Sequence, residues 1–208
     1  MALELDRATR RRLAQVSETL AAEFDGVFSR QTVAGVVTDS LARLGDATVF
    51  QYLPVLCERF ARQRLRAAAQ ADGLLAKTAP VLLFVCAGNA GRSQMAAALA
   101  THVSQGRVEA LSAGANPAAR IDLQVLDVMA EIGIALTLEF PKPLTDEVIR
   151  AADVVVTMGC GEVCPIHPGP RYLDWPIDDP AGRSLASVRR IRQDIANHVL
   201  DLLKELLA

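Results

Sequence analysis

Residues 81–99 read VLLFVCAGNAGRSQMAAAL, and the rest of the chain is organised around them. Five apolar residues lead into Cys86, a turn with two glycines follows, and an alanine-rich stretch begins at Arg92. This order is typical of a buried strand, a tight loop and the first turn of a helix. The sequence therefore predicts a strand over 81–86 and a helix over 92–104, with the functional loop between them.

The loop has the composition of an anion-binding nest. Gly88 and Gly91 permit backbone angles that other residues avoid, so that successive N–H groups can point inward. The N-terminus of the following helix adds positive potential, and the planar guanidinium of Arg92 can bind two oxygen atoms. The residues expected to bind an oxyanion are Ala87, Gly88, Asn89, Ala90, Gly91 and Arg92.

Cys86 lies at the edge of this nest, where the same positive charge favours a thiolate, and Ser93 can hydrogen-bond the sulfur. One interpretation is a nucleophile that attacks a bound tetrahedral oxyanion. The alternative is a buried structural cysteine in a glycine-containing turn. The complete pattern, with five residues between cysteine and arginine and a serine next, favours the nucleophile.

Composition excludes several classes of protein. The chain has 208 residues, enough for one medium domain and a small one, and 51% of them are hydrophobic. A net charge of −2 gives no indication of nucleic acid or membrane binding, and no apolar run approaches the ~20 residues of a membrane span. The N-terminal residues lack the apolar core of a signal peptide, so we expect a cytoplasmic protein. In such a protein, four cysteines favour catalytic, redox or metal use over a disulfide scaffold. Cys57, which stands beside apolar residues of a predicted helix, is interpreted as a buried thiol.

The first part of the chain, residues 1–75, has the apolar spacing of three helices, which predicts a small helical bundle. Ser29 is a candidate N-cap, and Pro54 marks a helix start or a kink. Residues 29–45 have a sequence pattern similar to that of a helix-turn-helix, but the charges of residues 1–75 are nearly balanced. We therefore favour a docking, dimerising or solubilising bundle over DNA binding. Residues 76–80 are the predicted linker.

From residue 81 onward, strand and helix patterns alternate, which predicts an α/β domain over 81–208. The expected architecture is a parallel four-stranded sheet flanked by helices. The four predicted strands are 81–86, 108–114, a weaker one at 134–140, and 153–158. The predicted helices are 92–104, 121–133, 145–152 and 185–207. Folds of this class bind ligands at the C-terminal ends of the strands, where the loop after Cys86 falls.

Two further cysteines, Cys160 and Cys164, follow the last predicted strand, so we expect them at the same edge of the sheet as Cys86. One interpretation is a pair of resolving thiols that completes a redox reaction begun at Cys86. A metal site and two incidental cysteines are the alternatives. We favour the redox pair, because structural zinc usually needs four ligands and His167 is the one obvious nitrogen nearby.

A candidate proton donor lies in the segment DWPIDDPAGRS, residues 174–184. Asp179, just before Pro180, is our choice for the acid that protonates a departing oxygen, with Asp178 in reserve. An ordinary acidic turn is an equal alternative, because Asp-Pro and Pro-Ala-Gly are frequent in turns. None of the histidines is assigned a catalytic role.

The motifs CAGNAGRSQMA, SAGANPA, PKPL, TMGCGEVCP and DWPIDDPAG, in this order, resemble arsenate reductases of the low-molecular-weight protein tyrosine phosphatase fold. The likeness covers about residues 80–208 and is strongest to thioredoxin-coupled members with three working cysteines. Some actinobacterial members are also similar in carrying a helical N-terminal extension.

The resemblance implies a role for each of these residues. Cys86 would attack arsenate held by the loop amides and Arg92, with the thiolate stabilised by Ser93 and the leaving oxygen protonated by Asp179. Cys160 would attack the resulting adduct, releasing arsenite and leaving a Cys86–Cys160 disulfide. Cys164 would then form a Cys160–Cys164 disulfide.

The resemblance also implies the partners. Thioredoxin would reduce the final disulfide, with a low-molecular-weight thiol and a glutaredoxin-like protein as the alternative donor. Phosphate and sulfate would compete with arsenate. No bound cofactor and no metal are expected, since Ala97 stands where some relatives have an acidic potassium ligand. The alternative function is hydrolysis of phosphate monoesters through a phosphocysteine.

Overall fold

The computed structural model describes residues 5–44, 52–159 and 164–208. The chain forms two compact units, Met1–Ala76 and Lys77–Ala208. In both, the described helices include none that is long and apolar enough to cross a membrane. Cys160 lies outside the described residues.

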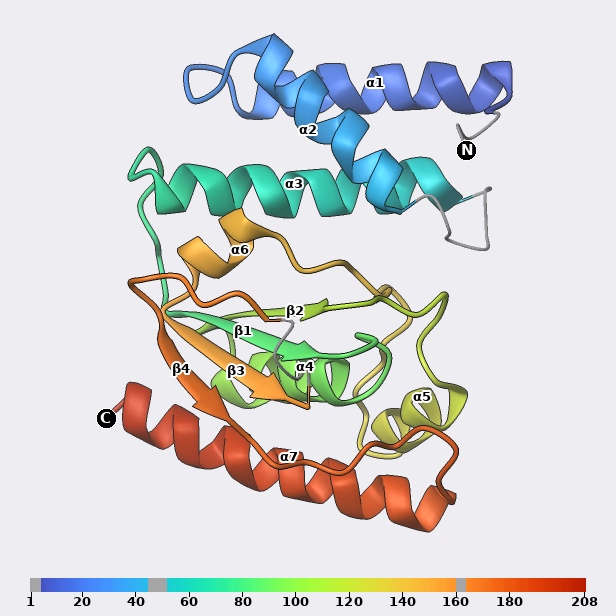
Figure 1. Cartoon of the computed structure of the whole chain (residues 1–208), viewed down its shortest axis with the longest axis vertical. Coiled ribbons are helices and arrows are strands. Elements are labelled where there is room, and N and C mark those ends of the chain that lie inside the picture. Colours follow the sequence, from blue (N-terminus) through green and yellow to red (C-terminus); the bar gives the residue numbers. More distant parts are fainter. Residues whose placement is uncertain (1–4, 45–51, 160–163) are drawn as a thin grey trace. The chain divides into compact units, whose positions relative to one another are not determined.

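The first unit contains three described helices, as predicted: α1 (Arg7–Glu23), α2 (Arg30–Arg43) and α3 (Leu53–Ala71) (Figure 1). The Ser29 hydroxyl caps α2 by accepting a hydrogen bond from the Thr32 N–H, and Pro54 occupies the first turn of α3, where its missing N–H costs nothing. Leu20, Val33 and Phe60 are among the apolar side chains buried in this unit.

The second unit contains the predicted parallel sheet of four strands (Figure 1). The strands are β1 (Val81–Cys86), β2 (Glu109–Gly114), β3 (Val154–Met158) and β4 (Arg171–Asp174), in the order β2-β1-β3-β4. β1 lies between β2 and β3, and all six of its residues are buried. This burial explains the uninterrupted apolar run before Cys86.

The prediction of a strand at 134–140 was wrong, and the fourth strand is β4 at the sheet edge. The 134–140 segment is a loop that turns at Leu136, whose carbonyl accepts a hydrogen bond from the Glu139 N–H. Ile134 and Leu136 are buried in the core cluster, so their apolar spacing reflects a packed loop and not a pleated strand. β4 is only four residues long and partly exposed, which left a weak pattern in the sequence.

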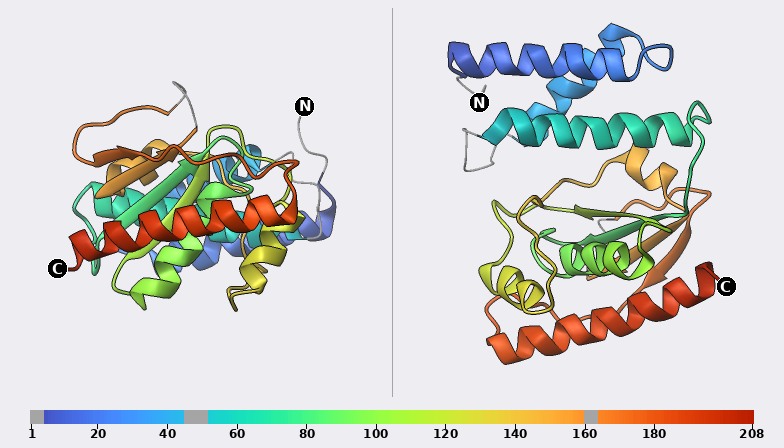
Figure 2. Two further views of the ribbon diagram at one scale, coloured as in Figure 1. Left: turned by 90° about the horizontal axis from the view of Figure 1, so that it is seen from below. Right: turned by 180° about the vertical axis from the view of Figure 1, so that it is seen from behind.

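Helices cover both faces of the sheet, and they are α4 (Arg92–Ser104), α5 (Leu123–Ala130), α6 (Asp146–Ala151) and α7 (Leu185–Leu206). Figures 1 and 2 show α4, α5 and α7 on one side and α6 on the other. The core on the first side joins Phe84 of β1 to Met95 of α4 and Ile195 of α7. This packing fixes the carboxyl end of β1 beside the first turn of α4.

Candidate active site

The loop after β1, residues 86–92, has the form expected of an anion-binding nest, and we call this loop the cradle. A second segment binds its carbonyl groups from outside. Backbone N–H groups of residues 115–122 donate to four loop carbonyls: Ala115 to Cys86, Asn116 to Ala87, Ala118 to Gly88, and Asp122 to Ala90. The peptide bonds are trans, so each carbonyl directed outward leaves the next residue's N–H on the opposite side. The N–H groups of Ala87, Gly88, Asn89 and Gly91 are thereby directed away from this segment, as oxyanion binding requires.

Asn89 holds the turn of the cradle in a left-handed backbone conformation, with φ of 47°. Asparagine adopts this region more readily than most residues, and here its buried side chain is fixed on every side. Its Oδ1 accepts hydrogen bonds from the Lys142 N–H at 2.7 Å and the Gln94 side chain at 3.1 Å. Its Nδ2 donates to the Ser93 hydroxyl at 2.8 Å.

This network leaves the Ser93 proton available for a hydrogen bond to Cys86. The Lys142 backbone N–H can only donate, so Asn89 must present its oxygen there and its NH₂ group to Ser93. The Ser93 oxygen is therefore an acceptor from Asn89, and its own proton is available for the Cys86 sulfur, 3.0 Å away. A donor aimed at the sulfur stabilises the thiolate.

Arg92 begins α4, and its guanidinium is held beside the cradle. Nη1 donates to the Ile177 carbonyl at 3.3 Å, and Nη2 forms a salt bridge with the Asp179 carboxylate. Gly159, directly after β3, packs against this guanidinium. A Cβ there would lie 2.7 Å from Nη1, and its φ of 67° also favours glycine. Gly159 is thus required for the position of Arg92.

These residues enclose a pocket of about 190 Å³, lined among others by Cys86, Gly88, Arg92 and Asp179. Gly91 lets the acidic loop approach the cradle, since a Cβ there would lie 2.7 Å from Cγ of Pro180. The arrangement can hold a small tetrahedral oxyanion against the Cys86 sulfur, with a carboxyl group at the same pocket.

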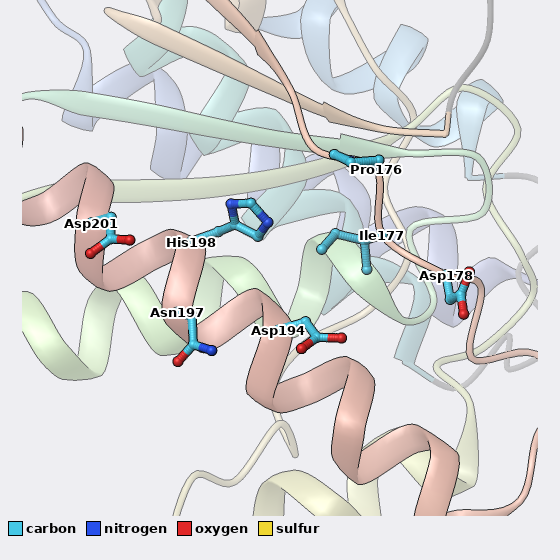
Figure 3. A pocket seen from close by; sticks show the side chains of 7 residues that line it. All are labelled: Pro176, Ile177, Asp178, Asp194, Asn197, His198 and Asp201. Atoms are coloured by element: carbon cyan, nitrogen blue, oxygen red, sulfur yellow. The ribbon is translucent and has the colours of Figure 1, made fainter.

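The two candidate acids, Asp178 and Asp179, line different pockets. Asp179 lines the pocket of Cys86. Asp178 lines a groove of about 380 Å³ between its own loop and α7, where Figure 3 shows it with His198 and Asp194. The His198 ring stacks on Trp175 at 4.9 Å between centroids, so this histidine packs against the loop's start and does not line the Cys86 pocket. Asp179 is the acid that the geometry supports.

The three cysteines that the structure describes are in two states. Cys164 is disulfide-bonded, whereas Cys86 and Cys57 carry free thiols. Cys86 is the register partner of Met158 in the adjacent strand β3. The carboxyl end of β3, at Met158, therefore lies at the same edge of the sheet as Cys86.

Cys57 has no part in this site. It is buried in the first unit, and its sulfur lies 3.5 Å from the Val37 carbonyl, to which it donates. Burial raises the pKa of the Cys57 thiol to about 11, so the group stays protonated and unreactive at neutral pH. Cys57 is a structural cysteine.

Sequence reasoning did not identify several residues that support the site. Gly159 makes room for Arg92, and Gly114 makes room for Asn89, whose Cβ would lie 2.9 Å from a Cβ added there. Gln94 donates to both Asn89 and the Phe140 carbonyl. Gly114 ends β2 and Gly159 directly follows β3, and a glycine at the end of a strand is a signal of a close approach, although it does not identify the neighbouring group.

Among the described residues, no group of three or more histidine, cysteine, aspartate or glutamate side chains is arranged to hold a metal ion. His167 instead contacts Asp146, 3.3 Å from its Nε2 to the carboxylate.

Two protein families match the chain. Residues 81–208 match the low molecular weight phosphotyrosine protein phosphatase family. Residues 13–69 match the protein-tyrosine-phosphatase-like N-terminal domain.

Individual relatives extend this likeness. A thioredoxin-dependent arsenate reductase of Corynebacterium glutamicum is 41% identical, with a TM-score of 0.86, over 95% of this chain and 97% of that one. A putative arsenate reductase of Halobacterium salinarum is 38% identical over 59% of this chain and 89% of its own length. A solved arsenate reductase in its phosphate-binding state is 28% identical, with a TM-score of 0.54, over 61% of this chain and 98% of that one.

Proposed function

The chain belongs to the low molecular weight phosphotyrosine protein phosphatase family, and within it we propose that this protein reduces arsenate to arsenite with electrons from thioredoxin. One observation carries the proposal: a free Cys86 in an oxyanion pocket coexists with a disulfide at Cys164, after the strand that pairs with β1. We assign the chemistry to residues 81–208. Similarity to a thioredoxin-dependent arsenate reductase along nearly the whole chain supports the assignment.

The first step uses the pocket of Cys86. The loop N–H groups and Arg92 bind the arsenate oxygens, and the Cys86 thiolate, with the Ser93 hydroxyl donating to it, attacks arsenic. Asp179 gives a proton to the oxygen that leaves as water. The product is a Cys86 thioester of arsenate, in which arsenic is still pentavalent.

The second step transfers the electrons. The Cys160 thiolate attacks the Cys86 sulfur, so that a sulfur–sulfur bond forms and the sulfur–arsenic bond breaks. The electron pair of that bond stays on arsenic, which leaves as trivalent arsenite. Two thiols have lost two electrons in total, and arsenic has gained them.

The third step regenerates the nucleophile. The Cys164 thiolate attacks the Cys160 sulfur, releases Cys86 as a thiolate, and leaves a Cys160–Cys164 disulfide. The thioredoxin dithiol reduces that disulfide and becomes a disulfide itself. The free Cys86 and the disulfide-bonded Cys164 fit a chain that has completed this step. A low-molecular-weight thiol with a glutaredoxin-like protein is the alternative donor.

Phosphate monoester hydrolysis is the second candidate, since Cys86 and Asp179 would suffice for it. Two observations favour the reductase. Hydrolysis makes no use of a disulfide at Cys164. In addition, the described residues that line the pocket include no aromatic ring to stack on a phenyl ester. Phosphate and sulfate are expected to compete with arsenate for the cradle.

A working thiol relay needs surroundings that keep thiols reduced, and we therefore place the protein in the cytoplasm. We assign it no nucleic acid partner, no membrane partner and no bound cofactor.

A coupled assay tests the proposed function. NADPH, thioredoxin reductase, thioredoxin and arsenate are combined with the wild type, Cys160→Ser or Cys164→Ser. We expect wild-type NADPH oxidation well above the enzyme-free rate and loss of turnover in both variants. Wild-type oxidation at the enzyme-free rate would contradict the function, and normal turnover of both variants would contradict the relay.

A further inference from the structure

We propose that Ile166 is the apolar contact on which the protein that reduces the Cys164 disulfide docks, and that Tyr172 holds Ile166 in place for it. The inference rests on the proposed function. It adds a specific docking residue and the kind of surface that the reductant must present.

The exposure of Ile166 is the first observation. At 80% exposed, it is the most exposed large apolar side chain among the residues that the structure describes. A single exposed apolar residue needs no explanation by itself. This one, however, stands two residues after a disulfide-bonded cysteine, in the sequence Cys164-Pro165-Ile166.

Reduction of the Cys164 disulfide by a protein requires that protein to contact the surface around Ile166. Thiol–disulfide exchange needs the attacking sulfur within bonding distance, about 2 Å in the product, so the partner must touch the disulfide itself. Two residues span at most roughly 7 Å along the chain. A weak redox interface of ~1,200 Å² covers ~600 Å² on each partner, a patch that reaches roughly 14 Å from its centre. Ile166 therefore lies within the footprint of any protein that reduces Cys164.

The backbone next to Ile166 is hydrogen-bonded to the sheet. The next residue, His167, is bound at both of its peptide groups by one hydroxyl: its N–H donates to Tyr172 Oη at 2.8 Å, and its carbonyl accepts from Tyr172 at 3.2 Å. Tyr172 belongs to β4 and is paired with Val155 of β3, so the clamp is anchored in the sheet.

Two prolines restrict the backbone of this segment further. Pro165 and Pro168 stand on either side of the Ile166–His167 pair, and each fixes its own φ angle. A contact that is held in place before binding loses little conformational entropy when the partner docks. An apolar side chain in such a position stabilises a small interface well, because few residues dominate interface energies.

These features identify the occupant as a dithiol protein of the thioredoxin class with an apolar surface beside its reactive cysteine. A small thiol such as dithiothreitol reaches the disulfide without covering Ile166. The two kinds of reductant are therefore expected to respond differently to a change at this position.

The test compares Ile166→Ser with Ile132→Ser. Ile132 is a matched control, an exposed isoleucine of the same unit in the turn after α5. Figure 1 shows α5 on the opposite side of the sheet from α6, which contacts His167. We measure kcat/KM for thioredoxin with arsenate saturating, and the rate at which dithiothreitol reduces the oxidised protein. Ile166→Ser is expected to lower kcat/KM for thioredoxin about tenfold and to leave the dithiothreitol rate unchanged. Ile132→Ser is expected to change neither.

Tyr172→Phe tests the two hydrogen bonds between the Tyr172 hydroxyl and the His167 backbone. Because it removes only the hydroxyl, it should lower kcat/KM for thioredoxin in the same direction as Ile166→Ser and add little in the double variant. A wild-type value of kcat/KM for thioredoxin in Ile166→Ser would overturn the proposal, as would an equal loss in Ile132→Ser or with dithiothreitol. Failure of the proposed function is distinguishable, because reduced wild type would then form no arsenite even without thioredoxin.

Discussion

The Ser93 hydroxyl oxygen lies 3.0 Å from the sulfur of Cys86, and a Cys86 thiolate there can only accept the Ser93 proton. Asn89 donates to the same oxygen, which leaves the Ser93 proton available for the sulfur. Nucleophile activation in this site thus depends on a chain of hydrogen bonds that begins at a backbone N–H more than fifty residues away, at Lys142.

Ser93→Ala should lower kcat/KM for arsenate by roughly 10- to 100-fold, because a hydrogen bond to a charged group contributes about 1.5–3 kcal/mol. The matched control is Ser104→Ala, which removes a buried serine hydroxyl from the same helix that donates a hydrogen bond to the Thr101 carbonyl. Steady-state kinetics with arsenate as the varied substrate measure the effect. Equal rates for the two variants would contradict the role of Ser93.

Asn89→Ala should act on the same step as Ser93→Ala, because Asn89 orients the Ser93 proton. In a double-mutant cycle, the loss of kcat/KM in the double variant should therefore be clearly smaller than the product of the two single losses. Asn89→Ala should also lower the free energy of unfolding, since it strands the Lys142 N–H and places alanine at a positive φ. Fully multiplicative kinetic losses would show that the two residues act independently.

Gly159→Ala should raise KM for arsenate, because its Cβ would displace the Arg92 guanidinium from the cradle. Gly133→Ala is the control for backbone strain. Gly133 also has a positive φ, 77°, but a Cβ there would meet no atom within 4 Å. The two variants should lose similar stability in thermal unfolding, and only Gly159→Ala should lose arsenate affinity. A KM that rises equally in both would contradict the contact with Arg92.

Cys57→Ala should leave turnover unchanged, because the buried Cys57 thiol, with its pKa of about 11, takes no part in the relay. In the folded, fully reduced wild type at pH 8, about one Cys57 in a thousand is a thiolate, so iodoacetamide should label this residue last. Peptide mass spectrometry gives the order of labelling. Loss of turnover in Cys57→Ala, with the fold retained, would place Cys57 in the chemistry.

The sequence was sufficient to predict the elements with strong local signals. The apolar run before Cys86 and the glycines after it predict the central strand and the loop, and the helical stripe of 185–207 corresponds to α7. The segment 134–140 misled the prediction, because apolar residues that pack from a loop have the same spacing as those of a strand. β4 was missed because a short edge strand buries little of its surface.

The supporting parts of the site were not predictable for a different reason. Gly159 and the Lys142 N–H act only because the fold brings them to Arg92 and Asn89, which are more than fifty residues distant in sequence. A glycine shows that something approaches closely, but only the folded chain identifies the neighbour. The spacing of Cys86, Arg92 and Ser93 is local, and this is why it could be interpreted directly.

The most direct measurement of the central claim is a single turnover without any external reductant. Fully reduced protein is mixed with arsenate, arsenite is quantified, and the disulfide formed is mapped by peptide mass spectrometry. The account predicts arsenite in an amount stoichiometric with the protein, a Cys160–Cys164 disulfide in the wild type and a Cys86–Cys160 disulfide in Cys164→Ser. Reduced wild type that forms no arsenite and keeps all of its thiols would contradict it.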